Sequence, residues 1–159
     1  MEKKGQAWGF DLIAASFIFI GGILLFYTYS INLSDETEDL IAGMNYEGSA
    51  IAESLLSEGI PSAWNASNVE RIGLLDSGKI NDEKLSNFYQ LSIDDYQKTR
   101  SLFNTKYNYY ISLEVNMSIN SLEIEGIGSR ALSPKNLLRI TRLTIYKNKP
   151  VILNVDIWK

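Results

Sequence analysis

Residues 12–31 form an unbroken run in which no side chain carries a charge. The charged leader Met-Glu-Lys-Lys-Gly and the segment Gln-Ala-Trp-Gly-Phe-Asp precede it. About 20 apolar residues in helical form match the hydrocarbon thickness of a bilayer. A helix is required there because unpaired backbone N–H and C=O groups cannot be left in lipid. The run therefore predicts one transmembrane helix over residues 6–33, and the rest of the chain is expected to work at a membrane.

The charges that flank this run predict its orientation. Lys3 and Lys4 precede it, whereas four acidic residues lie within residues 35–39. Positive charge in short flanking segments prefers the cytoplasmic side of a membrane. We therefore expect the N-terminus inside, residues 34–159 outside, and membrane lipid as a partner of the chain.

Composition excludes several kinds of chemistry. The 159 residues leave room for the span and for one domain of modest core over residues 34–159. The chain has no cysteine and no histidine, so disulfides, thiolate or histidine metal sites and a Ser-His-Asp triad are excluded. Its net charge is −4 and it has no basic stripe, which argues against nucleic-acid binding. We predict no cofactor and no enzymatic activity.

Three interpretations of the N-terminus are open. A cleaved secretory signal fits poorly, because no small-x-small cleavage site follows the apolar run. An uncleaved signal anchor is the plain alternative. In the third interpretation a leader is cut before the run, and the apolar helix stays on the mature protein.

The third interpretation rests on a resemblance. The segment Lys3-Lys4-Gly5-Gln6 resembles the class III signal peptide of archaeal type IV pilin-like proteins. The resemblance implies that a prepilin peptidase cuts between Gly5 and Gln6 and so removes leader residues 1–5. It also implies that the apolar helix packs against other pilin-like subunits in a filament.

The resemblance has one departure in register. The family usually has Glu as the fifth mature residue, whereas here that position is Phe10 and the nearest acid is Asp11. The family implies that such a carboxylate neutralises the new α-amino group of a neighbouring subunit. It would also lie favourably at the positive end of the helix dipole. Asp11 lying at headgroup depth is the alternative.

An amphipathic helix is expected over residues 35–58. Ser34 is a candidate N-cap, and the acidic residues after it favour a helix start. The apolar residues Leu40, Met44, Ile51 and Leu55 recur at helical spacing, with Ile41 and Leu56 widening the stripe. Gly59-Ile60-Pro61 would end the helix. If this helix continues the membrane span, the two form one long N-terminal helix.

A loop region over 61–80 and two short helices are expected to follow. Asn81 can cap a helix that ends near Leu91, and Ser92 can open a second helix that ends near Phe103.

Strand signals dominate the remainder of the chain. Residues 107–119 alternate strictly between apolar and polar side chains, and residues 122–125 extend this strand or form their own. Residues 138–147 and 151–157 flank a tight turn at 147–150, which predicts a hairpin. At least three antiparallel strands are expected after the helices, so the predicted fold class is α+β. Pilin-like proteins show the same order, with a long N-terminal helix packed on a C-terminal antiparallel sheet.

Three N-glycosylation sequons begin at Asn32, Asn65 and Asn116. The predicted orientation places all three outside the cell. Asn65 is the best placed because it falls in a predicted loop, whereas Asn32 lies close to the expected bilayer.

The acidic pairs and tyrosines that could carry other chemistry are expected to have structural roles instead. Asp94 and Asp95 are adjacent and would point in different directions on a helix, whereas Glu123 and Glu125 are expected to face solvent. Tyr107 and Tyr109 are expected in the core. The sequence therefore predicts a pilin-like subunit, major or minor, of a surface filament. The alternative is a signal-anchored extracytoplasmic binding protein that does not polymerise.

Overall fold

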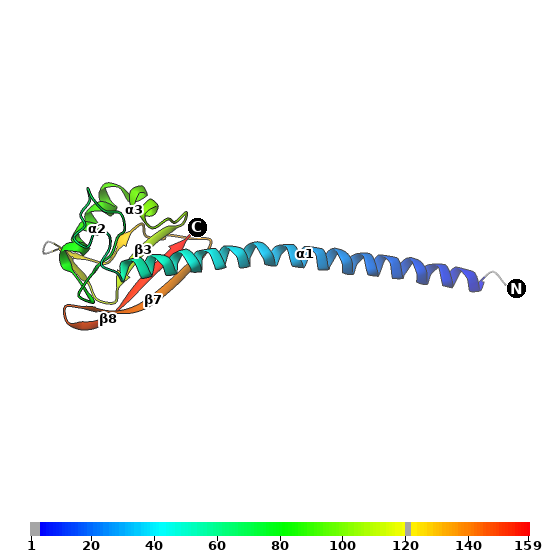
Figure 1. Ribbon diagram of the computed structural model, residues 1–159. Helices are drawn as coiled ribbons and strands as arrows, with labels where there is room; N and C mark the ends of the chain where they lie inside the picture. Colours follow the sequence, from blue (N-terminus) through cyan, green and yellow to red (C-terminus); the bar gives the residue numbers. More distant parts are fainter. Residues whose placement is uncertain (1–3, 120–121) are drawn as a thin grey trace. The chain divides into compact units, whose positions relative to one another are not determined.

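The computed structural model of the chain describes residues 4–119 and 122–159, with side chains over 9–31, 38–119 and 122–159. The chain divides into two compact units, residues 1–40 and 41–159. The described backbone of the first unit is entirely helical, and that of the second combines helices with antiparallel strands (Figure 1). The predicted α+β class, with an apolar N-terminal helix and an antiparallel sheet, is confirmed.

Helix α1 (Lys4–Leu55) is continuous in secondary structure. The helix start predicted at Ser34 is therefore wrong, and the alternative of one long N-terminal helix is correct. The physical reason is that residues 31–42 contain neither glycine nor proline, so nothing in this stretch interrupts a helix.

The end of α1 lies three residues before the predicted end. Ser57 lies just beyond the helix, and its hydroxyl donates to the Ser54 carbonyl oxygen at 2.7 Å. The same hydroxyl oxygen accepts from the Gly59 backbone N–H at 3.2 Å. Gly59 has a φ of +80°, a conformation that suits glycine. The side chain of Ser57 thus replaces the backbone bonds of a further helical turn.

Four antiparallel strands form the main sheet, in the order β6-β3-β8-β7. Their bounds are β3 (Asn108–Leu113), β6 (Ile127–Gly128), β7 (Leu137–Tyr146) and β8 (Lys149–Trp158). Strand β8 lies centrally, with β3 on one side and β7 on the other. The predicted hairpin and the expectation of at least three antiparallel strands are both confirmed.

The β7–β8 turn is tighter than predicted. Only Lys147 and Asn148 form it, with φ values of +48° and +62°, as in a type I′ hairpin turn. Strand β8 therefore begins at Lys149 and includes Pro150. Proline is tolerated there because β3 pairs with β8 only from Leu153 onward, so no ladder hydrogen bond is lost.

The single strand predicted over residues 107–119 is two strands. Strand β3 ends at Leu113, and β4 (Met117–Ile119) pairs instead with β5 (Leu122–Ile124). Val115, which the alternation assigned to the buried face, is 45% exposed between them. The alternation continues across the break because β4 also buries one of its faces.

Helices α2 (Asp82–Asp94) and α3 (Tyr96–Leu102) partly match their predictions. Asn81 caps α2 as expected, but α2 extends past Leu91, and Ser92 is buried within it. Asp95 opens α3 instead, because its carboxylate accepts from the Lys98 backbone N–H at 2.9 Å.

Residues 61–80 contain more structure than the predicted loop. Strands β1 (Leu75–Asp76) and β2 (Lys79–Ile80) form a small hairpin, and Trp64 is 2% exposed. The indole N–H of Trp64 donates to the Gly73 carbonyl oxygen at 2.7 Å. This bond holds the loop against the core of the second unit.

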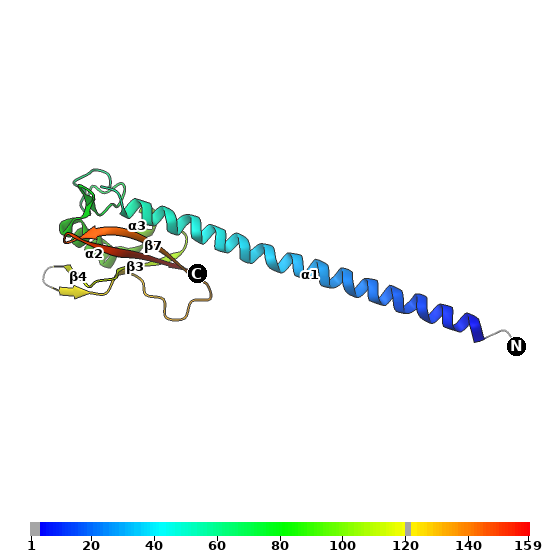
Figure 2. The same cartoon turned by 90° about the horizontal axis from the view of Figure 1, so that it is seen from below.

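The second unit has two layers, a sheet and the helices that cover one of its faces (Figures 1 and 2). Tyr109 and Ile157 are paired across β3 and β8, so their side chains lie on that same face. Phe88 of α2 stacks on Tyr109 with ring centroids 6.4 Å apart. A Cβ added at Gly48 of α1 would lie 3.3 Å from Ile157, so this glycine permits close approach of helix and sheet.

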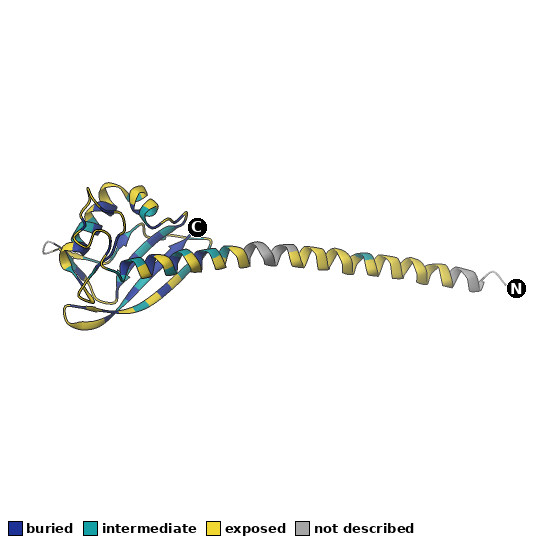
Figure 3. Cartoon of the chain, in the orientation of Figure 1, coloured by how far each residue is buried: buried dark blue, intermediate teal, exposed yellow. Residues whose placement is uncertain are grey.

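The core residues of this unit are apolar side chains with little exposure (Figure 3). Met44, Ile51 and Leu55 of the predicted helical stripe are buried, whereas Ile41 is 48% exposed. Tyr107 and Tyr109 are buried as expected.

Candidate functional site

The apolar segment of α1, Gly9–Ile31, is the first candidate site. It is 23 residues long, and it is long and apolar enough to cross a membrane. None of its residues is buried (Figure 3). Phe10, Phe17 and Ile18 are each at least 75% exposed. A continuous apolar surface of this size marks contact with a membrane or with another protein.

Two hydroxyls within the apolar segment satisfy their hydrogen bonds locally. Ser16 donates to the Leu12 carbonyl oxygen at 2.8 Å. The hydroxyl of Thr28 lies 3.0 Å from the carbonyl oxygens of Leu24 and Leu25. Such backbone-directed bonds let hydroxyls enter an apolar environment without an unmet donor. The segment is therefore chemically suited to lipid or to a helix bundle.

Asp11 is exposed near the start of this segment. No hydrogen bond or ion pair to it occurs among the residues whose side chains are described. The first turn of α1 holds no acidic residue, because the helix begins at Lys4. The prediction for Asp11 concerns the chain after removal of residues 1–5, so its role near the start of the helix stays a prediction.

The predicted processing residues Gly5 and Gln6 belong to the backbone of α1. Their side chains lie outside the described residues, as does the side chain of Asn32.

Asn65 lies in an exposed turn of the second unit. Its side-chain oxygen accepts from the Ser67 hydroxyl at 2.6 Å and from the Ser67 backbone N–H at 2.9 Å. The Asn65 backbone N–H donates to the side-chain oxygen of Asn68 at 2.7 Å. The sequon is thus folded on itself, with the Asn65 amide oriented by the third sequon residue.

Asn116 is placed differently. Its side-chain N–H donates to the Glu123 carboxylate at 3.1 Å, and Ser118 of the same sequon is part of strand β4. A strand held in a ladder is a poorer acceptor segment than an exposed turn. That Asn65 is the best placed of the three sequons stays a prediction, and its exposed turn supports it.

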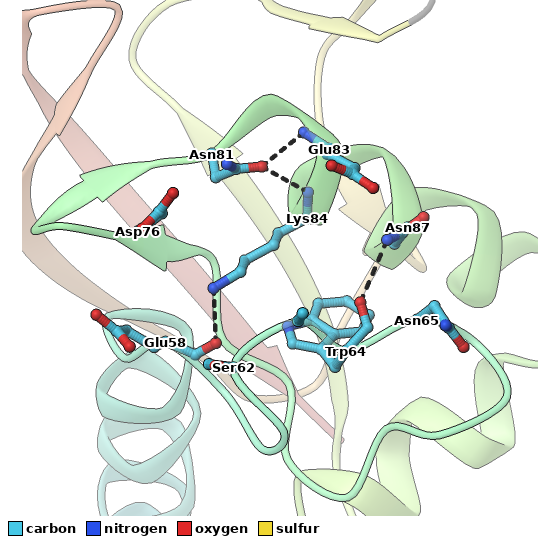
Figure 4. Close-up of a pocket in the computed structure, with 10 residues that line it drawn as sticks. Glu58, Ser62, Trp64, Asn65, Asp76, Asn81, Glu83, Lys84 and Asn87 are labelled. Atoms are coloured by element: carbon cyan, nitrogen blue, oxygen red, sulfur yellow. Dashed lines mark hydrogen bonds between the residues drawn. The ribbon is translucent and has the colours of Figure 1, made fainter.

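A polar pocket of about 380 Å³ is the second candidate site (Figure 4). We call it the Lys84 pocket. It is lined by Glu58, Ser62, Ala63, Trp64, Asn65, Asp76, Asn81, Glu83, Lys84 and Asn87. These residues come from the segment after α1, from β1 and from the first turns of α2, so the fold alone brings them together.

The ammonium group of Lys84 is fixed within this pocket. Lys84 is 9% exposed, and its Nζ donates to the carbonyl oxygens of Glu58 at 2.8 Å and Leu75 at 2.6 Å. The N-cap Asn81 positions the start of the helix, since its side-chain oxygen accepts from the backbone N–H of Lys84 at 3.1 Å. A buried charge of this kind is tolerated because carbonyl oxygens replace its water.

The pocket has more acceptors than donors. The carboxylates of Glu58, Asp76 and Glu83 make no ion pair with any residue whose side chain is described. No group of acidic residues suited to holding a metal ion occurs in the described part of the chain. The arrangement can therefore hydrogen-bond a neutral polar ligand through carboxylates and amides.

The acidic pairs singled out in the sequence do not form a shared site. Asp95 caps α3, and Glu123 accepts from Asn116. Glu125 lies 2.7 Å from Arg130 in an exposed ion pair. Each carboxylate thus has a local structural partner.

Sequence reasoning identified the apolar segment and Asn65 but missed the Lys84 pocket. One signal was available: a tryptophan in an otherwise polar loop favours burial against the core. The positions of Glu58, Asp76 and Lys84 relative to one another depend on tertiary contacts and leave no spacing pattern. Comparison of the chain with protein-family models, with curated proteins and with solved structures finds no match.

Proposed function

We propose that this protein is a pilin-like subunit of a surface filament, anchored and then assembled through its N-terminal helix. The observation that carries the proposal is the exposed apolar segment Gly9–Ile31 joined in one chain to an α+β unit. Water cannot be the lasting environment of such a segment. Lipid covers it before assembly, and neighbouring helices cover it in the filament.

The proposed processing step creates the assembling form. A prepilin peptidase removes residues 1–5, so that Gln6 becomes the new N-terminus with a free α-amino group. Asp11 then lies in the second turn of the shortened helix, where its carboxylate is available to the α-amino group of a neighbouring subunit. Because lipid disfavours an isolated carboxylate, this pairing favours the filament over the membrane.

The proposed orientation follows from the flanking charges. Lys3 and Lys4 hold the N-terminus in the cytoplasm, and residues 34–159 lie outside. Asn65 is then available for glycosylation on the outer side, with Asn116 as a weaker acceptor.

The N-terminal residue of the protein isolated from its host tests this proposal. We expect mass spectrometry to find a mature chain that begins at Gln6. Replacing Gly5 with tryptophan should leave the precursor uncut and abolish filament formation. Gly9→Trp is the matched control, because it adds the same bulk beyond the cleavage site. An intact Met1 in the mature cellular protein would exclude the pilin mechanism.

A signal-anchored extracytoplasmic binding protein is the second candidate function. The Lys84 pocket favours it, because a pocket of about 380 Å³ can hold a small polar ligand without any polymerisation. This alternative predicts no cleavage at Gly5 and a monomer after extraction in detergent, so the same mass measurement separates the two functions.

A further inference from the structure

Asn65 is both a sequon asparagine and a residue that lines the Lys84 pocket. Its side-chain oxygen is held by Ser67, which fixes the plane of the amide. The side-chain nitrogen, the atom that would carry a sugar, makes no hydrogen bond to any described residue. Asn65 lies at the edge of the pocket, and in the view of Figure 4 its side chain points away from Lys84, so the first sugars of a glycan have to turn back toward α2 to enter the pocket.

Polar groups of this pocket have hydrogen-bonding capacity to spare. The side-chain nitrogen of Asn81 and the side-chain oxygen of Asn87 have no partner within the described part of the chain. The Glu83 carboxylate is also unused there, and Lys84 uses two of its three N–H groups. Donors and acceptors are thus interspersed along one surface.

Saccharide hydroxyls match this surface because each can both donate and accept a hydrogen bond. A metal ion fits less well, because no group of acidic residues in the described part of the chain is suited to holding one. An apolar ligand fits less well, because carboxylates and amides line the pocket and Trp64 is only 2% exposed.

We propose that the Lys84 pocket binds the first sugars of a glycan linked to Asn65 of the same chain. This inference rests on the proposed function for the outward position of Asn65. A covalent tether makes the contact intramolecular, so the effective sugar concentration is on the order of millimolar. Contacts too weak to capture a free saccharide are therefore sufficient to hold the attached one.

The test uses the full chain isolated from its host in detergent. Mass spectrometry of the peptide that contains Asn65 first determines whether the glycan is present. Hydrogen–deuterium exchange is then compared between the glycosylated chain and the Asn65→Gln variant. We expect amides of residues 81–87 to exchange roughly two- to tenfold more slowly with the glycan, the range that a net hydrogen bond supplies.

Two substitutions on helix α2 test whether the glycan slows exchange by binding in the pocket. Asn87→Ala removes a pocket side chain and should abolish the protection that the glycan confers. Gln90→Ala removes an exposed amide of the same helix that does not line the pocket, and should leave that protection intact. Each variant is measured with and without the Asn65 glycan. The difference between the two exchange rates then reports the glycan alone, because the effect of the substitution on stability is common to both.

Three results would overturn the proposal. The first is an unmodified Asn65, and the second is a glycan that leaves exchange unchanged. The third is undiminished protection by the glycan in the Asn87→Ala variant, because the glycan would then act away from the pocket. The N-terminal residue of the same preparation reports separately on the filament proposal.

Discussion

Residues 9–31 and residues 41–159 contain similar apolar side chains in opposite environments. Phe17 in the first region is 75% exposed, whereas Phe88 in the second is fully buried in contact with the rings of Phe103 and Tyr109. The second region alternates apolar with polar residues, so each element has one face for the core and one for water. The first region carries no charge after Asp11, and none of its residues is buried. Its apolar surface is therefore left uncovered by the described part of the chain.

Charges introduced into the apolar segment should have the largest effect, because they remove its apolar character. Ile20→Lys combined with Leu24→Lys places two charges near the middle of the segment, each costing about 3 kcal/mol on membrane-insertion scales. We expect the protein to leave the membrane fraction during alkaline extraction. Tyr46→Lys is the matched control, since Tyr46 is 78% exposed on the part of α1 in the second unit. Retention of the double variant in membranes would contradict a bilayer span.

Truncation of a phenylalanine should lower the free energy of unfolding in the second region but not in the first. Phe88→Ala removes a ring with no exposure and is expected to lower the free energy of unfolding by about 3–5 kcal/mol. Phe17→Ala removes an exposed ring and should leave that free energy unchanged. Urea denaturation of the full chain in detergent, followed by tryptophan fluorescence, measures both. Equal effects would show that residues 9–31 contribute to the core.

A larger side chain in place of glycine should destabilise the protein in one part of α1 and not in the other. Gly48→Leu places side-chain atoms against Ile140 and Ile157, and overpacking of this kind costs about 1–3 kcal/mol. Gly21→Leu has no atom within 4 Å of its added Cβ and should not weaken the second unit. The urea midpoint reports the difference. A lower midpoint for Gly21→Leu would contradict the separation.

Alkaline pH should produce the smallest effect, and only in the second unit. Burial raises the pKa of the Tyr109 phenol, opposed in part by its hydrogen bond with Thr99. The unfolded chain therefore loses this proton first. The contribution of Tyr109 to stability is full below pH of about 10 and falls above it by at most ~1.4 kcal/mol per pH unit.

Urea midpoints measured from pH 9 to pH 11 check this slope. Tyr109→Phe cannot ionise, so its stability should decline less steeply over the same range, even though it lacks the bond to Thr99. Parallel slopes for the two proteins would exclude Tyr109 as the source of the alkaline decline.

Long periodic segments were predicted well because a single physical requirement shapes them. The apolar stripe Met44, Ile51 and Leu55 and the alternation in β7 and β8 follow from burying one face of an element. Boundaries were predicted less well. Ser34 carries the chemistry of a helix cap, yet it lies inside α1 because its neighbours equally support a continuing helix.

The break between β3 and β4 could not be predicted from alternation. Both strands bury alternate residues, and only the choice of partner, β8 or β5, distinguishes them. The same limit applies to the Lys84 pocket. Asn65 was identified from its sequon, but its position beside Lys84 depends on how the segment after α1 folds against α2.

The apolar segment, the order of helix before sheet and the absence of cysteine and histidine can all be read from the sequence alone. These properties depend on composition and on local periodicity, which every conformation of the chain shares. Tertiary structure alone decided where Lys84 finds its two carbonyl acceptors, which strand pairs with β3, and which sequon lies beside a pocket. Such pairings join residues distant in sequence, so their energies arise only once the chain has folded.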